Sequence, residues 1–165
     1  MITIKNVLVA TDFGEAAQAA LEYGRHLARL SGARLHVLHV VRNVFLDALA
    51  VEGETIDLVA IQDAIERAAR QQLDSLVLAH DRLAGDAKTV ATTSNSPAVA
   101  IVAYAEDNHI DLIVLGTHGR GGVAHLLMGS VAERVVRTAP CPVLTLKKPE
   151  QESRPAEGLE AAARA

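Results

Sequence analysis

Short apolar runs alternate strictly with longer stretches of helical periodicity, and this alternation limits the fold more than any other feature of the sequence. Five runs of four to seven residues are too short to be stable helices, because helix nucleation is unfavourable, and this length favours strands. The first run is apolar throughout, as expected for a strand that is covered on both faces. The five runs comprise residues 7–10, 35–41, 87–93, 112–115 and 142–146.

A helical pattern lies between each run and the next. Gly32 follows the first pattern and suits a helix C-terminus, whereas Ser96 and Pro97 open the third, where a hydroxyl can cap free N–H groups and proline fits the first helical position. In the second pattern, the apolar residues predict one buried stripe that comprises Leu58, Ile61, Ile65, Ala68, Ala69, Leu73, Leu76 and Val77. The four predicted helices cover about residues 17–31, 56–83, 97–108 and 130–138.

Alternating strands and helices predict right-handed crossovers and therefore a parallel sheet. We expect a single-domain α/β fold over residues 1–148, with a doubly wound, five-stranded, Rossmann-like parallel sheet and helices on both faces. In such folds, ligands bind at the carboxyl ends of the strands where the strand order reverses. Asp12 and Gly116 follow two of the predicted strands directly.

Two segments fall outside this pattern. Residues 42–55 have no clean period, yet they are too apolar for an ordinary solvated loop, which suggests a mobile flap or contact segment. Residues 149–165 are polar and then alanine-rich, without core-forming branched residues, and they predict a disordered or weakly helical tail.

Charge and aromatic content argue against nucleic-acid binding. The formal net charge is −4, and aromatic residues make up only 2% of the chain, so that neither a basic field nor a stacking platform is available. The single Cys141 has no second thiol with which to form a disulfide or a zinc pair. Met1 leads directly into strand-like sequence without a secretory apolar region, from which we expect a cytoplasmic protein without membrane contact.

Glycine gathers in one place. Five of the 11 glycines lie in the 14 residues from Gly116 to Gly129, after the fourth predicted strand and before a predicted helix that starts at Ser130. Glycine allows backbone N–H groups to converge on a ligand, and a helix N-terminus favours an anion. This arrangement predicts a phosphate-binding loop, although tight turns and a simple helix cap at Ser130 would also explain it.

The familiar phosphate motifs do not match. No glycine precedes a lysine, which excludes the Walker-type loop of fast NTPases. The segment from Gly119 to Ala124 fits the dinucleotide fingerprint, but the next strand ends at Lys147 instead of an acidic residue that would bind a ribose. Asp12 also lacks the adjacent acidic residue that a magnesium-dependent phosphoacceptor site would need.

No set of residues presents a nucleophile with its base and an orienting partner. His118 and His125 flank the glycine-rich segment without a paired carboxylate, and His36 and His39 are three positions apart and should point to opposite faces of their strand. Arg120 alone suggests charge stabilisation during phosphoryl transfer. We therefore expect no dedicated enzyme, and any hydrolysis of a bound phosphate compound should be slow.

Gly116-Thr117-His118-Gly119, followed after nine residues by Gly129-Ser130, resembles the nucleotide-binding signature of the universal stress protein family. The resemblance extends over about residues 3–148. It includes Thr11-Asp12, Leu38-His39-Val40, Ser96-Pro97-Ala98, the segment 111–114 and the segment 140–144. It implies the adenine nucleotide alpha hydrolase-like version of the Rossmann-like fold and, because the glycine signature is kept, the ATP-binding type.

The resemblance implies a site for ATP, or for ADP or AMP, with or without Mg²⁺. Thr11, Asp12 and Val40 would surround the adenine and ribose together with Leu115 and Gly116, and the phosphates would contact Gly119, Arg120, Gly129, Ser130 and Val131. Two other interpretations stay open: Asp12 with Glu15 also resembles a capping box for the first helix, and Arg120 could point into solvent.

These features suggest a stress-response sensor or regulatory module in which ATP orders the glycine-rich segment and a protein partner reads that ordered state. The resemblance also implies a homodimer, made through the last strand near Val143. Two alternatives are a nucleotide-free interaction module that docks a partner on residues 44–51, and a slow ATPase.

Overall fold

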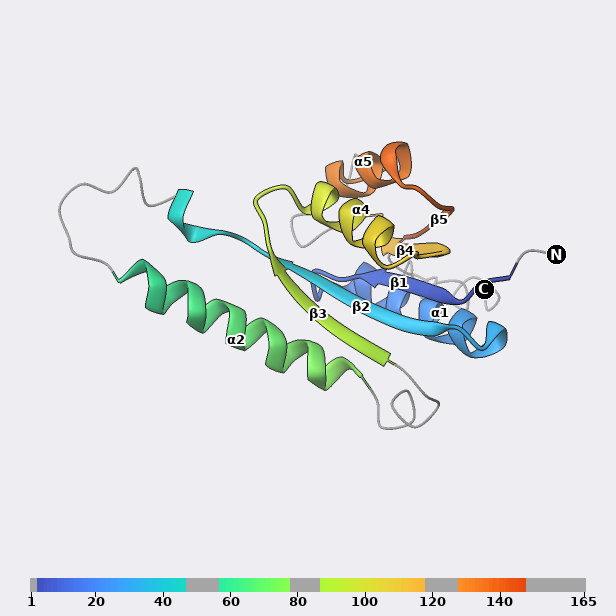
Figure 1. Cartoon of the computed structure of the whole chain (residues 1–165), viewed down its shortest axis with the longest axis horizontal. Helices are drawn as coiled ribbons and strands as arrows, with labels where there is room; N and C mark the ends of the chain where they lie inside the picture. The colour runs from blue at the N-terminus through green and yellow to red at the C-terminus, as the bar shows by residue number, and fades with distance from the viewer. Residues whose placement is uncertain (1–2, 47–56, 78–86, 118–127, 148–165) are drawn as a thin grey trace, which may run out of the picture.

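The computed structural model describes residues 3–46, 57–77, 87–117 and 128–147. Within them, five parallel strands form one sheet in the order β3-β2-β1-β4-β5 (Figure 1). The strands are β1 Asn6–Ala10, β2 Arg34–Val41, β3 Ala87–Thr93, β4 Leu112–Gly116 and β5 Val143–Leu146. The predicted strands are confirmed to within one residue at either end.

Four α-helices and one short 3₁₀ helix connect these strands in the described residues. They are α1 Glu15–Ser31, η1 Val44–Leu46, α2 Leu58–Leu76, α4 Pro97–Asp107 and α5 Ser130–Thr138. Helices α1 and α2 cover one face of the sheet, and α4 and α5 cover the other (Figure 1). The predicted α/β fold with helices on both faces is confirmed. None of the described helices is both long enough and apolar enough to cross a membrane.

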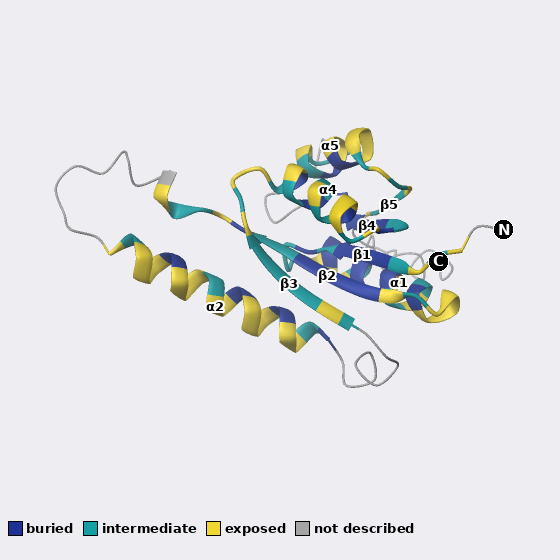
Figure 2. Ribbon diagram, in the orientation of Figure 1, coloured by how far each residue is buried: buried dark blue, intermediate teal, exposed yellow. Residues whose placement is uncertain are grey.

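The core consists of two apolar clusters, one on each face of the sheet. Val7 and Val9 of β1 lie in the cluster on the α1 and α2 side, whereas Leu8 between them lies in the cluster on the α4 and α5 side. All three are fully buried, because consecutive side chains of a strand point to opposite faces. Figure 2 shows this burial along β1, β2 and β4, with the two outer strands less covered.

The strand order reverses between β1 and β4. From β1 the chain moves outward through β2 to β3, and then it returns to β4 on the other side of β1 and continues to β5. Val9 pairs with Val114, and Ala10 pairs with Leu115, so that the carboxyl ends of β1 and β4 lie next to each other. Asp12, just after β1, and Gly116, at the end of β4, therefore lie at neighbouring strand ends where the strand order reverses.

Backbone chemistry explains most helix ends. Gly32 ends α1 in the left-handed conformation, with φ of 66°, and its N–H reaches back to carbonyl oxygens of the last turn. Pro97 occupies the start of α4 as predicted, but the Ser96 side chain does not cap that helix. The expected Ser96 cap is therefore wrong. The Ser94 hydroxyl accepts a hydrogen bond from the Ser96 N–H instead, at 3.1 Å.

The second helix differs most from the sequence-based expectation. It begins at Leu58 and ends at Leu76, and its side chains Ile61 and Ile65 are 40% and 39% exposed. The predicted apolar stripe is therefore wrong at these two positions and at Ala68, which is also exposed. Gln62 is buried beside them, because its Oε1 accepts a hydrogen bond from the Val44 N–H at 3.0 Å. The inward side of α2 thus combines the apolar Ala69 and Leu73 with a polar side chain that is satisfied by a backbone hydrogen bond.

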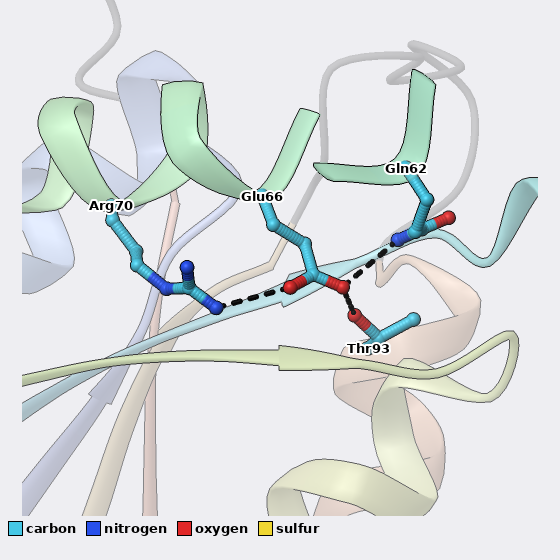
Figure 3. Close-up of polar contacts among 4 residues, drawn as sticks. All are labelled: Gln62, Glu66, Arg70 and Thr93. Carbon is cyan, nitrogen blue, oxygen red and sulfur yellow. Dashed lines mark hydrogen bonds and ion pairs between the residues drawn. The ribbon is translucent and has the colours of Figure 1, made fainter. Parts of the chain in front are cut away.

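Glu66 attaches α2 to the end of β3 (Figure 3). Its Oε1 accepts hydrogen bonds from the Thr93 hydroxyl at 2.7 Å and from Gln62 Nε2 at 3.2 Å, and its Oε2 accepts one from Arg70 at 3.0 Å. Hydrogen bonds from Thr93 and Gln62, together with the Arg70 charge, lower the pKa of Glu66 below its usual value. The carboxylate form is thus the one that this contact favours.

Candidate functional site

The turn after β1 is formed by its own side chains. The Thr11 hydroxyl accepts a hydrogen bond from the Phe13 N–H at 3.0 Å, and Asp12 Oδ1 accepts one from the Gly14 N–H at 2.9 Å. Helix α1 then begins at Glu15 with Gly14 as its N-cap residue. Asp12 therefore makes an Asx-type turn, two residues before the cap. The capping-box interpretation of Asp12 and Glu15 is wrong.

Backbone contacts hold this turn beside the neighbouring strands. The Thr11 N–H donates to the Leu38 carbonyl at 2.9 Å, which continues the β1–β2 ladder past the end of β1. On the other side, Gly116 ends β4 against the first turn of α1, where a Cβ on Gly116 would lie 2.8 Å from the Ala16 carbonyl carbon. This close approach of β4 to α1 requires glycine at position 116.

An apolar wall lies on the α4 and α5 side of the sheet at this end. It comprises five side chains from β1, β2, β4 and the start of α5, all packed in or against the same core cluster. Leu115 pairs with Ala10, and Val40 lies two residues beyond the β2 residue that pairs with Ala10. The wall consists of Ala10, Val40, Leu115, Met128 and Val131.

The N-terminus of α5 lies at the same end of the sheet. Its N-cap residue is Gly129, which has extended backbone and offers no side chain to cap the helix. Ser130 is exposed and is the first residue inside the helix. The interpretation of Ser130 as a simple helix cap is therefore wrong, because Gly129 occupies the N-cap position. The first N–H groups of a helix have no acceptor within it and attract anions. An uncapped helix start of this kind can bind a phosphate group.

Thr117 connects this helix start to the sheet. Its N–H donates to the Leu146 carbonyl of β5 at 2.7 Å, and its carbonyl accepts a hydrogen bond from the Gly129 N–H at 2.6 Å. Thr117 is buried, with 5% of its surface exposed. The two ends of the glycine-rich segment are therefore held together at the carboxyl end of β4.

The structure describes eight of the ten predicted site residues. It brings Val40, Leu115 and Val131 into the apolar wall and places the others at adjacent strand ends or at the start of α5. Gly119 and Arg120 lie outside the described residues, as do His118 and His125. The other described site residues are Thr11, Asp12, Gly116, Gly129 and Ser130.

Ala10, Phe13 and Met128 were not among the predicted site residues, and neither was Thr117, although it lies within the glycine-rich signature. Ala10 and Met128 directly precede the predicted site residues Thr11 and Gly129, so their neighbours in sequence could have indicated them. Phe13 has a φ of 65°, an uncommon conformation for a residue with a bulky side chain, which the sequence did not indicate.

The histidines of β2 point to opposite faces, as predicted. His36 is buried, and its Nδ1 lies 2.8 Å from the Tyr104 hydroxyl of α4. His39 lies on the other side, with its Nδ1 2.8 Å from the Thr11 carbonyl oxygen and its ring centroid 4.3 Å from that of Phe13. Burial raises the pKa of Tyr104. The described part of the chain contains no group of three His, Cys, Asp or Glu residues placed to hold a metal ion.

This arrangement is suited to binding. It combines apolar side chains at the strand ends, the Asp12 carboxylate in the turn after β1 and a helix N-terminus, which suit an apolar group, a hydrogen-bond donor and an anion. Phosphate contacts require no nucleophile from the protein.

Comparisons with known proteins agree on one family. The sequence description of the universal stress protein family matches residues 3–147. A universal stress protein of Thermus aquaticus is 34% identical over 143 residues, which cover 87% of this chain and 98% of that protein.

Solved structures show the same fold. The structure of MJ0577 from Methanocaldococcus jannaschii superimposes with a TM-score of 0.75 at 25% identity, over 88% of this chain and 97% of that one. A universal stress protein of Archaeoglobus fulgidus, solved in complex with dAMP, superimposes with a TM-score of 0.58 at 26% identity. That alignment covers 89% of this chain and all of the other.

Proposed function

The chain belongs to the universal stress protein family, and we propose that it binds an adenine nucleotide, ATP in particular, at the carboxyl ends of its strands. We further propose that it acts in the stress response as a sensor or regulatory protein that changes state with its ligand.

One observation carries this proposal: side chains of three strands and of the α5 N-terminus meet at the point where the strand order reverses. Ligands of open α/β sheets bind at such switch points. The apolar wall can accept the face of a base, and the uncapped N-terminus of α5 favours the negative charge of a phosphate. The related dAMP-bound structure from Archaeoglobus fulgidus supports adenine as the base.

Residues take the following roles in this proposal. Val40 and Leu115 pack on the adenine, and Asp12 accepts a hydrogen bond from a ribose hydroxyl or from the adenine amino group, beside Thr11 and Gly116. Gly129, Ser130 and Val131 bind the phosphates, together with Gly119 and Arg120 outside the described residues. The Ser130 hydroxyl is also suited to ligate a Mg²⁺ ion that accompanies ATP.

Ser130→Glu tests the phosphate role, because its effects on binding and on stability have opposite signs. A carboxylate in the first turn favours the helix by about 0.3–1 kcal/mol, whereas it repels a bound polyphosphate. We expect ATP affinity to fall by about tenfold or more, which corresponds to roughly 1.4 kcal/mol. Isothermal titration calorimetry measures the affinity, and urea unfolding measures the stability.

Ser130→Gln is the matched control, since it has nearly the same size without the charge. Adenosine, which lacks phosphates, should bind Ser130→Glu as well as it binds the wild type. If Ser130→Glu bound ATP as tightly as Ser130→Gln, the α5 N-terminus would not be the phosphate site.

The sensor role predicts that ATP slows amide hydrogen exchange between Gly116 and Ser130, because phosphate contacts restrict the backbone. Hydrogen exchange with and without saturating ATP measures this directly. Equal exchange in both states would show that the nucleotide does not change this segment, and the sensor role would fail.

A nucleotide-free interaction module is a second candidate, favoured by exposed apolar side chains on η1 and α2. Phe45 is 41% exposed and Val59 62%, next to the exposed Ile61 and Ile65. A single measurement distinguishes the nucleotide-binding protein from the interaction module. Protein that carries no adenine nucleotide when purified, and that binds none at millimolar ATP with Mg²⁺, would favour the interaction module.

A further inference from the structure

The turn that carries Asp12 adopts a backbone conformation that its residue types do not favour. Phe13 has a φ of 65°, which is costly for a residue with a Cβ and which glycine would adopt more easily. Such conformations persist only where the surroundings hold them, and they concentrate at functional sites. Contacts with neighbouring residues must therefore hold Phe13 in this conformation.

Two side-chain acceptors hold the turn from within. The Thr11 hydroxyl accepts from the Phe13 N–H, and Asp12 Oδ1 accepts from the Gly14 N–H. Both hydrogen bonds join residues two positions apart, so that they fix the shape of the turn but not its placement on the sheet.

Beside the backbone hydrogen bond from the Thr11 N–H to the Leu38 carbonyl, His39 of β2 adds a side-chain contact from outside the turn. Its Nδ1 lies 2.8 Å from the Thr11 carbonyl oxygen, and because a carbonyl can only accept, this nitrogen must carry the hydrogen. The His39 ring also packs on Phe13 with ring centroids 4.3 Å apart and planes tilted by 40°. One side chain thus holds both the residue before Asp12 and the residue after it.

His39 does not itself face the candidate site. It neighbours Val40 along β2, and consecutive strand residues point to opposite faces. Val40 lies in the apolar wall on the α4 and α5 side, whereas Phe13, which His39 contacts, packs against the core cluster on the α1 and α2 side. Any effect of His39 on a ligand at the wall would therefore pass through the turn.

We infer that His39 is a positioning residue: from the opposite face of the sheet, it holds the Thr11 carbonyl and the Phe13 ring so that Asp12 is placed for a nucleotide before the ligand arrives. This inference rests on the proposed nucleotide site. Without this contact, Phe13 relaxes toward negative φ in part of the molecules. Only the molecules that keep a positive φ at Phe13 then present Asp12 correctly. Apparent affinity falls in proportion to that fraction.

Two substitutions of His39 separate the hydrogen bond from the ring. Asparagine places an amide nitrogen close to the position of Nδ1 and can still donate to the Thr11 carbonyl, whereas leucine cannot. We expect His39→Leu to weaken ATP binding by about tenfold and His39→Asn to stay within about threefold of the wild type. Calorimetric titration at a temperature where every variant is fully folded measures both.

His36→Leu is the matched control for a general loss of stability. His36 is a buried histidine of the same strand, but it contacts Tyr104 of α4 instead of the turn. We expect His36→Leu to lower the unfolding temperature while its ATP affinity stays within twofold of the wild type.

A second readout needs no ligand. The three-bond coupling between the amide and α protons of Phe13 reports its φ, and it should change in unliganded His39→Leu but not in His39→Asn. If the wild type binds ATP and His39→Leu binds it equally well, the inference fails and the proposed function stands. If the wild type binds no adenine nucleotide, the proposed function fails, and the role of His39 in nucleotide binding fails as well.

Discussion

Gly116 lies where β4 and α1 approach so closely that no side chain fits between them. A Cβ on this residue would lie 2.8 Å from both the carbonyl carbon and the Cβ of Ala16. For the glycine-rich segment that begins at Gly116, the sequence suggested either ligand approach or tight turns. The structure adds a packing reason, because the backbone of β4 rests directly on the first turn of α1.

Gly116→Ala should destabilise the fold by about 1–3 kcal/mol, since the added methyl group forces the helix away from the strand. Urea unfolding measures this change. Ala16→Gly in the same chain removes one of the two clashing atoms but leaves the helix backbone, so that it should restore only part of the loss. Full stability of Gly116→Ala alone would show that α1 can move away at no cost.

At the scale of the elements, the sequence predicted strands better than it predicted the second helix. The inner strands β1 and β4 are short apolar runs whose limits are visible without tertiary information, and the more polar strand Ala87–Thr93 is also confirmed at both ends. Helix α2 is amphipathic, and its inward side includes Gln62 beside Ala69 and Leu73, with Gln62 accepting a hydrogen bond from the Val44 N–H. No apolar periodicity can indicate such a contact, because it joins a side chain to a distant backbone group.

The candidate site could likewise be predicted from the sequence only where local patterns determine it. Strand ends and the start of α5 follow from local patterns, and the sequence therefore gathered Asp12, Gly116 and Ser130 at one end of the sheet. The conformation of Phe13 and its contact with His39 depend on two strands lying side by side. Local sequence carries no signal for such a contact.

The contact between α2 and β3 should depend on pH through Glu66. Its pKa is lowered in the folded protein, so that the carboxylate stabilises the fold above the ordinary value of 4.5 and loses this effect as the pH falls through the lowered pKa. Glu66→Gln should therefore be less stable than the wild type at pH 7, and this difference should shrink below pH 4.5. Urea unfolding across this pH range measures it.

Thr93→Val removes the main donor to Glu66 and should reduce the same pH dependence. Asp63→Asn serves as a charge control on an exposed position of α2. If the stability difference between Glu66→Gln and the wild type stayed constant from pH 7 to pH 3, the carboxylate of Glu66 would not stabilise this contact.

At the scale of the whole molecule, β5 lies at one edge of the described sheet and pairs with β4 alone. The carbonyl groups of Pro142 and Leu146 accept hydrogen bonds from Ile113 and Thr117, which lie on the β4 side. Because alternate residues of a strand direct their backbone groups to alternate sides, those of Val143 and Thr145 face the edge. We propose that this edge pairs with a second copy of the chain to form a homodimer.

Thr145→Pro should convert the dimer into a monomer, because proline lacks the N–H that edge pairing would use. Thr145→Ala retains the N–H and should stay dimeric. Light scattering coupled to size-exclusion chromatography at micromolar concentration determines both masses. A monomeric wild type, or a dimeric Thr145→Pro that is correctly folded, would contradict dimerisation through β5.

The most direct measurement is a titration of ¹⁵N-labelled protein with ATP and Mg²⁺, followed by two-dimensional NMR. Binding at the switch point predicts saturable shifts that are largest for the backbone amides of Asp12, Val40, Leu115, Gly129 and Ser130, with smaller shifts around Phe45 on η1. Absence of saturable shifts at millimolar ATP, or shifts centred on η1 and α2, would contradict an adenine-nucleotide site at the carboxyl ends of the strands.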